Sequence, residues 1–421
     1  MDRSGRRFAG RRMVAVSMLV MTAAFGLNFA AGLFFSPLSQ RHGWSVGALS
    51  VAAAANTAIT GLLQPVVGRL VDRVGPRRVL TVGLVLLVAC YALLACVRQL
   101  WQFLLVYPLL GGAGFAAAAT LANSVLVSRW YVRDRARMLA RSAAGINLGQ
   151  LLILPLAGWL IVGYGTATAY LALGVMVAVT AVPAAALLLR DDPATLGQFP
   201  DGATHDVSTR LLNSPATSEG LKRQYRLALA SFGLHAMSLY FVLLHLPSYV
   251  VDLGGAVATG GQVLACAAAA SAAMMPAIGR LAARFGRETL LLTMHLLRGA
   301  ALLLAAASTS AWPLFVFAVL FGLSSFPVIP LTIAVLSTGR DPATLGRIMG
   351  RIWLVHQACA GLGVLAGGLT RAMTGTYRPY FLAAAALMAT SSLLIHRLTA
   401  TTHIQEPLTD PCHQPPAPAN T

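Results

Sequence analysis

Charged residues are scarce in this chain. Of its 421 residues, only 10% are Asp, Glu, Lys or Arg, whereas 57% are hydrophobic. Soluble globular domains carry about 25% charged residues. So few charges cannot cover a surface in contact with water. The composition therefore excludes an ordinary soluble protein and indicates that most of the outer surface faces an apolar medium.

Acidic residues are the rarer of the two charged kinds. The chain has 13 of them against 31 Lys and Arg, a formal net charge of +18, and Lys222 is the one lysine. Such a charge could indicate nucleic-acid binding. Here, however, the arginines stand in short clusters between apolar stretches, which is typical of a membrane protein with basic loops on its cytoplasmic side. We expect no nucleic-acid partner.

The sequence also lacks the patterns of an enzyme or a metal protein. Four of its five cysteines, Cys90, Cys96, Cys266 and Cys359, lie in apolar stretches, and none has metal-ligand spacing. We find no nucleotide-binding loop, metal cluster or nucleophile–base set. The sequence thus predicts no catalytic activity and no cofactor, and it argues against transport driven by ATP.

Long apolar runs are abundant. A helix that crosses a bilayer needs about 20 mostly apolar residues. That criterion predicts an all-α integral membrane protein with twelve transmembrane helices, six on each side of a polar stretch at 190–225. The predicted segments are 14–36, 47–70, 79–97, 100–127, 138–162, 167–189, 226–251, 256–281, 288–307, 312–337, 348–371 and 378–397.

Basic residues fix the expected orientation. If the N-terminus is cytoplasmic, 26 of the 31 basic residues fall on the cytoplasmic side, four on the other side and Arg298 within a helix. This asymmetry follows the positive-inside rule. We expect a multi-pass protein of the plasma (inner) membrane with both termini cytoplasmic. The predicted parts are an N-terminus at 1–13, a bundle at 14–189, a linker at 190–225, a bundle at 226–397 and a disordered Pro-rich tail at 398–421.

The two halves of the chain repeat one another. The run Gly68–Gly75 after the second segment matches Gly279–Gly286 after the eighth, 211 residues later. Phe25–Asn28 in the first segment matches Phe232–His235 in the seventh. Transporters built from such parallel repeats bind substrate between their halves near the middle of the membrane. The repeat therefore predicts two pseudo-symmetric six-helix bundles with a site between them.

A family resemblance emerges from these motifs. Gly68-Arg-Leu-Val-Asp72-Arg-Val-Gly75-Pro-Arg77-Arg78 resembles the signature loop of the major facilitator superfamily. The stretches at 32–45, 130–135, 196–202 and 245–254 are similar to the branch of monocarboxylate porters and oxalate/formate antiporters. The resemblance implies a monomeric antiporter, symporter or uniporter of a small molecule. Its halves are expected to rock about the site within the lipid bilayer.

The resemblance also implies a gating role for the signature loop. In the family, the acidic residue at Asp72 locks the outward-open state by contacting the other half, although it could merely orient the loop through its charge. Arg129, Arg133 and Arg135 could join the same network or only anchor the loop. The predicted gating residues are Gly68, Arg69, Asp72, Arg73, Gly75, Arg77 and Arg78, with Gly279, Arg280, Arg284 and Gly286 in the partial copy.

Some positions depart from the branch. Met275 stands before Pro276 where the branch usually has an Arg that anchors carboxylate, and Ser271 stands where an acidic partner is common. Two functions therefore stay open. One is transport of a monocarboxylate-like anion. The other is export of a bulkier amphipathic compound, for which the Ala-rich stretches at 52–55 and 267–270 leave room.

No Asp or Glu falls in the middle of a predicted helix. If protons are a partner in transport, a histidine must bind them, or the substrate must bring its own. Polar residues inside the membrane are the natural candidates for binding substrate. Our candidates are the equivalent pairs Asn28 and His235, and Asn147 and His356, together with Arg298 and Arg351.

Each candidate has a structural alternative. The four Asn and His side chains could form hydrogen bonds between helices. Arg298, with His295 one turn away, could pair with polar groups of neighbouring helices, and Arg351 could extend to the membrane surface. Weaker candidates for the site are Asn56, Gln64, Tyr107, Asn123 and Gln150.

Overall fold

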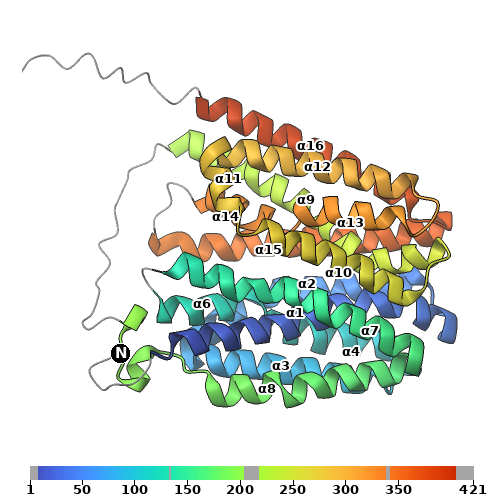
Figure 1. Ribbon diagram of the computed structural model, residues 1–421, viewed down its shortest axis with the longest axis horizontal. Coiled ribbons are helices and arrows are strands. Elements are labelled where there is room, and N and C mark those ends of the chain that lie inside the picture. Colours follow the sequence, from blue (N-terminus) through green and yellow to red (C-terminus); the bar gives the residue numbers. More distant parts are fainter. Residues whose placement is uncertain (1–7, 132–133, 203–217, 338–341, 404–421) are drawn as a thin grey trace, which may run out of the picture.

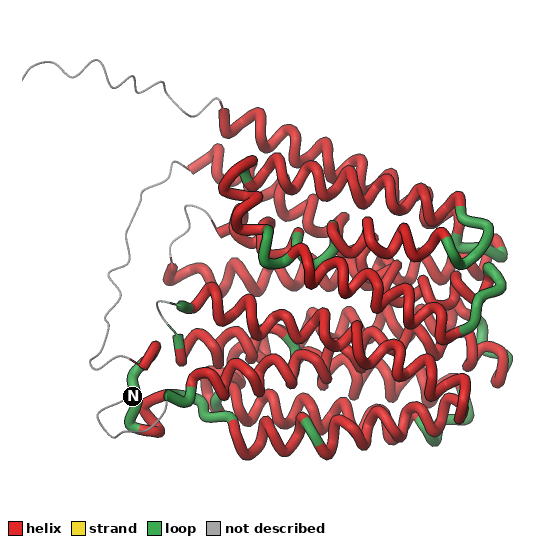
Figure 2. Tube along the Cα trace, viewed as in Figure 1, coloured by secondary structure: helices red, strands yellow, loops and turns green. Residues whose placement is uncertain are grey.

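The protein is a bundle of long helices. The computed structural model describes residues 8–131, 134–202, 218–337 and 342–403, and no strand occurs in these ranges (Figures 1 and 2). The Pro-rich tail beyond His403, residues 203–217 of the predicted linker, and the side chains of Arg133 and Arg135 lie outside the described part. Their predicted roles therefore receive no structural account.

The first half contains the crossings that precede the linker. Its helices are α1 (Gly10–His42), α2 (Val46–Val74), α3 (Pro76–Leu94), α4 (Leu100–Val106), α5 (Gly112–Ala118), α6 (Thr120–Trp130), α7 (Arg135–Val179) and α8 (Ala181–Pro183). Two π-helical turns, η1 (Tyr107–Gly111) and η2 (Ala184–Leu188), continue α4 and α8. Two 3₁₀ turns follow, η3 (Pro193–Leu196) and η4 (Pro200–Gly202).

The second half repeats this arrangement. Its helices are α9 (Ser218–Asp252), α10 (Val257–Met274), α11 (Ile278–Phe285), α12 (Arg287–Ala307), α13 (Pro313–Leu323), α14 (Val328–Ser337), α15 (Pro342–Thr374) and α16 (Arg378–His403).

The predicted number of crossings is confirmed. Eleven helical stretches are long and apolar enough to span a membrane, and one of them, 137–188, is 52 residues long. That stretch turns back at Gly165, whose φ of 81° is not helical. It therefore supplies two crossings, the predicted fifth and sixth segments, and the total is twelve.

Several predicted helices are interrupted or longer than expected. The eighth predicted helix is broken between α10 and α11, at Pro276. The tenth predicted helix is broken between α13 and α14, at Pro327. Proline lacks an N–H for the helical ladder and clashes with the preceding turn. In contrast, α1, α9 and α16 extend beyond the predicted ends. Hydropathy detects only the apolar part of a helix, and these ends are polar.

The repeat is visible in the backbone. Gly75, between α2 and α3, has φ 87° and ψ 151°, and Gly286, between α11 and α12, has φ 84° and ψ 149°. Residues with a side chain rarely adopt this region. Two glycines 211 residues apart thus form the same turn in both halves, as pseudo-symmetric bundles require.

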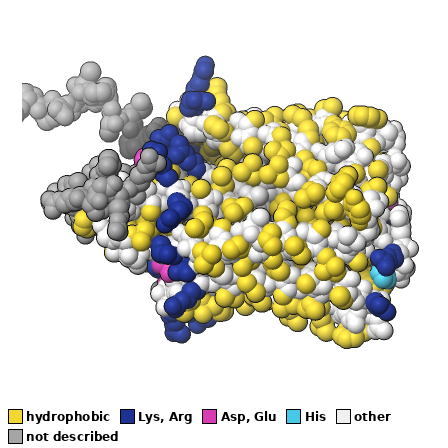
Figure 3. All heavy atoms as spheres, turned by 60° about the horizontal axis from the view of Figure 1, so that its bottom comes forward, with side chains coloured by type: hydrophobic (Ala, Val, Ile, Leu, Met, Phe, Trp, Pro, Cys, Tyr) yellow, Lys and Arg dark blue, Asp and Glu magenta, His cyan; other side chains and the backbone are white. Residues whose placement is uncertain are grey.

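Charges and apolar groups are segregated on the surface. Lys and Arg gather at one end, on the left in Figure 3, while the flank beside them is largely apolar. We call this the arginine-rich end; its exposed arginines include Arg12, Arg73 and Arg284. On the flank, Leu62 and Val179 are 67% and 66% exposed. Such a band is the surface that lipid covers, so the protein crosses the membrane several times.

Candidate functional site

A cavity of about 480 Å³ lies between the two halves. Its size suits a small organic molecule. Both halves line it, with Met21, Phe25, Gln64, Phe115, Ser142 and Asn147 from the first, and Tyr240, Met275, Phe326, Trp353, His356 and Gln357 from the second. Most of the lining is apolar or aromatic, with polar groups at a few positions.

The cavity faces the arginine-rich end. Leu139 lies near the start of α7 and Trp353 in the first half of α15, and both helices begin at that end. A Cβ built on Gly68 or on Gly350, farther toward the same end of α2 and α15, would meet nothing within 4 Å. The two halves are therefore separated on this side.

At the opposite end the halves are in contact. Between α7 and α10, a Cβ on Gly261 would lie 2.8 Å from the Leu154 carbonyl oxygen, and one on Gly158 would lie 2.9 Å from the Ala258 Cα. Between α2 and α15, a Cβ on Gly47 would lie 3.3 Å from the Ala372 Cβ. We call this the closed end. The missing side chains of its glycines allow the helices to approach closely.

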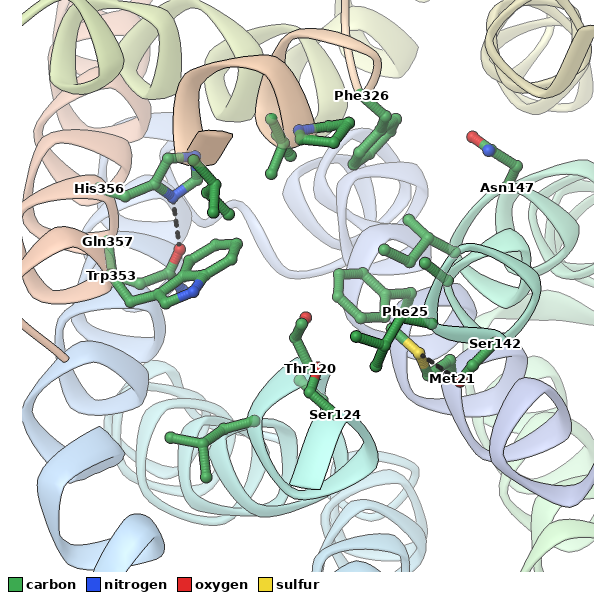
Figure 4. A pocket seen from close by; sticks show the side chains of 18 of the residues that line it. Met21, Phe25, Thr120, Ser124, Ser142, Asn147, Phe326, Trp353, His356 and Gln357 are labelled. Atoms are coloured by element: carbon green, nitrogen blue, oxygen red, sulfur yellow. Dashed lines mark hydrogen bonds between the residues drawn. The ribbon is translucent and has the colours of Figure 1, made fainter. Parts of the chain in front are cut away.

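The polar groups of the cavity form two facing walls. Figure 4 shows Trp353, His356 and Gln357 on one side and Ser142 and Asn147 on the other. On the first wall, the His356 Nδ1 lies 3.1 Å from the Gln357 Oε1. On the second, the Asn147 Oδ1 is buried and has no hydrogen-bond partner in the described part of the chain. A bound molecule could therefore hydrogen-bond to either wall.

Arg298 lies behind the α15 wall and does not line the cavity. It is 1% exposed, and its Nη1 lies 2.7 Å from the His235 Nδ1. Its Nη2 donates to the Ser324 carbonyl, at the break between α13 and α14. The guanidinium also lies over the Phe321 ring, 5.1 Å from the centroid. Arg298 thus joins α9, α12 and the broken tenth crossing near the middle of the bundle.

The structure separates the predicted substrate-binding residues into groups. Asn147 and His356 line the cavity. His235 and Arg298 are bonded to each other one layer behind it. Asn28 is buried away from the lining, and Arg351 is exposed, five residues before His356 toward the arginine-rich end. Among the weaker candidates only Gln64 lines the cavity.

The other weaker candidates have partners in their own half or do not reach the cavity. The Asn56 Nδ2 donates to the Tyr107 carbonyl at 3.0 Å, within the first half. The Asn123 Nδ2 donates to the Ala118 carbonyl, and its Oδ1 accepts from the Ser17 hydroxyl at 2.7 Å. Gln150 bonds to a carbonyl of its own helix. Asn56 and Asn123 thus form hydrogen bonds between helices of the first half.

The lining residues that the sequence analysis missed include Tyr240, Trp353 and Gln357. Trp353 and Gln357 lie three residues before and one residue after His356, so they share its region of α15. That spacing was the available signal, because neighbours at i and i+3 lie on one face of a helix. Tyr240 had no comparable signal, since it is one of many aromatic residues in apolar helices.

The signature loop is held by a residue outside the motif. The Arg77 backbone N–H donates to the Asp191 Oδ1 at 2.7 Å, and the Arg77 Nε donates to the Ala186 carbonyl at 2.9 Å. Asp72 is exposed and forms no ion pair with any described residue. In this conformation the loop is thus anchored to its own half, and Asp72 is free for other contacts.

Comparison with known proteins identifies the family. The family model of the Major Facilitator Superfamily matches residues 14–276 and again 228–419. The chain belongs to the major facilitator superfamily. The overlap of the two matches reflects the internal repeat, because each half resembles part of the same model.

Two relatives are similar over most of their length, and a third is similar over a shorter stretch. An uncharacterized transporter of this type, YcxA of Bacillus subtilis (strain 168), is 24% identical over 377 residues, covering 86% of this chain and 89% of its own. Monocarboxylate transporter 13 of Rattus norvegicus is 26% identical over 397 residues, covering 91% and 88%. The oxalate:formate antiporter of Oxalobacter formigenes is 26% identical over 166 residues, or 39% of each chain.

Solved structures of other transporters share the fold. A POT family transporter in complex with 5-aminolevulinic acid superposes with a TM-score of 0.73 at 14% identity, covering 94% of this chain and 96% of that one. A bacterial homolog of the human lysosomal transporter Spinster, inward-facing and occupied, gives a TM-score of 0.70 at 14% identity, covering 94% and 98%. These similarities concern the fold alone.

Proposed function

We propose that this transporter moves a small organic anion of the monocarboxylate type through the cavity by alternating access. The observation that carries the proposal is a buried positive charge without a negative partner. Arg298 lies behind the cavity wall, bonded to neutral groups, and no Asp or Glu of the described chain is bonded to it. An anion near this wall would supply the missing negative charge.

The energetics of burial support this reading. A charge in a membrane interior is costly unless a counter-charge or strong hydrogen bonds offset the lost hydration. The Ser324 carbonyl at the end of α13 and the Phe321 ring offset part of that cost. The Nε of Arg298 has no hydrogen-bond partner in the described ranges of the chain. An anionic substrate would be stabilised by this remaining positive charge, whereas a cationic one would be repelled.

The names of two relatives agree with this substrate class. The names of monocarboxylate transporter 13 and of the oxalate:formate antiporter both refer to carboxylates. In this chain the branch's usual arginine position is Met275, which lines the cavity. We infer that Arg298, reached from α12, provides the positive potential that Met275 cannot.

A second candidate is export of a bulkier amphipathic compound. The cavity volume of about 480 Å³ is several times that of the smallest carboxylates, and five aromatic residues line it. These are Phe25, Phe115, Tyr240, Phe326 and Trp353. Apolar pockets of this size commonly hold drug-sized ligands. Within the anion hypothesis, the same lining favours acids with an apolar body over formate or oxalate.

The membrane orientation belongs to the same proposal. By the positive-inside rule, the arginine-rich end faces the cytoplasm. Both termini would then be cytoplasmic in the plasma (inner) membrane, and the described conformation would be open to the inside. In the outward-open conformation, Asp72 of the signature loop would contact the second half, which would account for its exposure here.

Uptake into proteoliposomes tests the proposal. Labelled acetate, lactate and phenylacetate present the same carboxylate on bodies of increasing size. The comparison includes wild type, Asp72→Asn and Arg298→Ala, with and without an imposed pH gradient, after subtraction of entry into protein-free vesicles.

We expect saturable uptake of at least one acid, strongly reduced in Arg298→Ala while that protein remains folded. We expect Asp72→Asn to slow transport without changing which acids are taken up. Absence of uptake of all three acids by folded wild type would contradict the anion proposal and favour the exporter.

A further inference from the structure

Three histidines form a buried row in the second half. They are His356 on α15, His235 on α9 and His295 on α12, with exposures of 1%, 0% and 2%. The ring centroid of His235 lies 6.2 Å from that of His356 and 6.1 Å from that of His295. Each of the three rings leaves its Nε2 buried and without a hydrogen-bond partner among the residues that the structure describes. We call these residues the histidine row.

The hydrogen bonds of the two outer rings determine which nitrogen carries hydrogen. The His295 Nδ1 lies 2.7 Å from the Leu291 carbonyl oxygen, and the His356 Nδ1 lies 3.1 Å from the Gln357 Oε1. An oxygen of either kind only accepts, so each Nδ1 must donate. In a neutral imidazole the other nitrogen then has an open lone pair. The Nε2 atoms of His295 and His356 are therefore vacant proton acceptors.

The central ring has the opposite arrangement. A guanidinium can only donate, so the His235 Nδ1, 2.7 Å from the Arg298 Nη1, must accept. The hydrogen of neutral His235 is then on Nε2. Along the row the free nitrogens are thus acceptor, donor and acceptor. A protonated His235 could not keep its bond to Arg298 and would place two positive charges in contact.

Other charged groups are remote from the row. Arg298 and His295 are the titratable groups that face it from α12, His235 and Tyr240 from α9, and His356 from α15; the Tyr240 ring centroid lies 5.9 Å from that of His356. The α13–α14 break contributes the uncharged Ser324 carbonyl, and the Ser391 hydroxyl of α16 bonds to Ser231 of α9. The nearest acid along α12 is Glu288, seven residues before His295 and about 10 Å away along the axis. No carboxylate of the described chain is placed to balance an added proton.

The row does not have the form of a metal site. In the described residues, no group of three or more His, Cys, Asp or Glu side chains is arranged to hold a metal ion. Each buried hydrogen-bond acceptor that stays unpaired lowers the stability of the folded protein by about 1–3 kcal/mol. The ligand that fits single, separated nitrogen lone pairs in a dry interior is the proton.

We propose that the histidine row is the proton-binding site of this transporter, with His356 as the residue that accepts the proton. The ring of His356 forms part of the cavity wall. An N–H bond forms at its Nε2 while the O–H bond of a hydronium ion or of an entering carboxylic acid breaks, and no electron is transferred. This inference rests on the proposed function, because the anion in the cavity is what balances the new charge.

Anion and proton binding are linked by this arrangement. Arg298 already supplies one positive charge without a carboxylate, so a second positive charge at His356 forms more readily beside an anion and requires a more acid solution without one. Conversely, the protonated ring strengthens anion binding, because linkage is reciprocal. One proton would cross with one anionic charge, and transport would be electroneutral.

A titration without substrate tests the site directly. Purified protein with isotope-labelled histidine is titrated from neutral to acid pH and followed by histidine bands in infrared difference spectra. We expect a buried histidine signal that disappears in His356→Asn and shifts in His235→Asn. The Asn amide oxygen can still accept from Arg298 in the latter variant.

The matched control is His245. It is also fully buried in the second half, but its Nδ1 lies 3.2 Å from the Tyr377 hydroxyl and its Nε2 lies 2.9 Å from the Val364 carbonyl. His245→Asn should leave the titrating signal in place. A signal that is lost in His245→Asn and retained in His356→Asn would overturn the assignment.

Transport measurements distinguish a proton-binding role of His356 from a merely structural one. With the acetate, lactate and phenylacetate panel, a gradient of one pH unit can drive about tenfold accumulation of the transported acid, since 1.4 kcal/mol corresponds to tenfold. We expect His356→Asn to abolish this accumulation, while exchange of internal for external acid at equal pH persists with a lower affinity for the acid, because exchange needs no net proton movement. A merely structural residue would reduce both alike.

The outcomes are distinguishable. Gradient-driven accumulation in His356→Asn equal to that in wild type would contradict the assignment of proton binding to the histidine row. The proposal of anion transport would still stand. A histidine titration that behaves as expected, in a protein that takes up none of the acids, would keep the row and contradict the proposed function.

Discussion

Arg298 shows how a single cation can be kept inside a membrane bundle. Its donors reach the His235 imidazole and the Ser324 carbonyl, which belong to two other crossings. The carbonyl lies at the C-terminal end of α13, where the helix dipole favours positive charge. These contacts make Arg298 the group that holds the break of the tenth crossing, in addition to its proposed effect on anions.

Replacement of Arg298 by Leu should destabilise the folded protein. It leaves the His235 Nδ1 and the Ser324 carbonyl without donors, at about 1–3 kcal/mol for each buried acceptor. Thermal unfolding of purified protein measures the loss. Arg12→Leu, which changes an exposed arginine of α1, is the control and should alter stability by about 0.5 kcal/mol or less. Equal unfolding temperatures for the two variants would show that Arg298 does not hold the break.

The two glycines of the signature loop should respond differently to alanine. Gly75 has a positive φ, and an added Cβ would overlap the Asp191 carboxylate. Gly75→Ala should therefore cost about 1–3 kcal/mol, as for other residues forced into this backbone region. Gly68 is helical with open space around its Cβ position, so Gly68→Ala should be neutral or stabilise by up to about 1 kcal/mol. Chemical or thermal unfolding compares the two, and a harmless Gly75→Ala would contradict the turn geometry.

At the scale of the helices, the sequence predicted which segments are helical better than it predicted where those helices are broken. Twelve apolar runs, their division into six and six and the repeat of the Gly75 and Gly286 turns were predictable, because length, hydropathy and glycine placement are local properties. The breaks at Pro276 and Pro327 were not predicted, since proline also occurs inside unbroken helices of this protein, as at Pro65 in α2.

The site was predictable only in part. Asn147 and His356 were selected because polar residues in a membrane are costly, and both line the cavity. The partners of Arg298 could not be predicted, because the bond to His235 spans 63 residues and the bond to Ser324 spans 26. Such contacts depend on how helices pack. The asymmetry between a free Asp72 and an anchored Arg77 depends on the conformation, which one sequence does not specify.

The interface between α7 and α10 allows a prediction for conformational balance. Gly261→Leu would insert a side chain where a Cβ is already 2.8 Å from the Leu154 carbonyl. Overpacking costs about 1–3 kcal/mol, so the closed end should open in a larger share of molecules, about tenfold for each 1.4 kcal/mol. Pulsed EPR distances between labels on the α1–α2 and α15–α16 turns measure this opening. Gly163→Leu on α7, where an added Cβ meets nothing within 4 Å, is the matched control.

The whole molecule combines a cavity open toward the arginine-rich end with contact between the halves at the closed end. A carrier with one central site must also adopt the reverse arrangement, in which the closed end parts and the arginine-rich end closes. The pseudo-symmetry of the halves makes the two arrangements comparable in packing. In the reverse state, α2 and α15 would approach one another toward the arginine-rich end, where an added Cβ on Gly68 or on Gly350 now meets nothing within 4 Å.

A disulfide across the closed end tests the central claim, that organic anions cross by alternating access. The Gly47 and Ala372 Cβ positions are 3.3 Å apart, close to the 3.5–4.5 Å range of disulfides. Gly47→Cys with Ala372→Cys, in a protein whose own cysteines are replaced by serine, should bridge the halves on oxidation. Each single variant is the control.

Uptake of the labelled acetate, lactate and phenylacetate panel is then measured before oxidation, after oxidation and after reduction. We predict saturable uptake of at least one acid, its loss in the oxidised double variant, and its return on reduction, with both single variants unaffected. Continued uptake by fully cross-linked protein would contradict alternating access. Absence of uptake in the reduced, folded protein would contradict the substrate class.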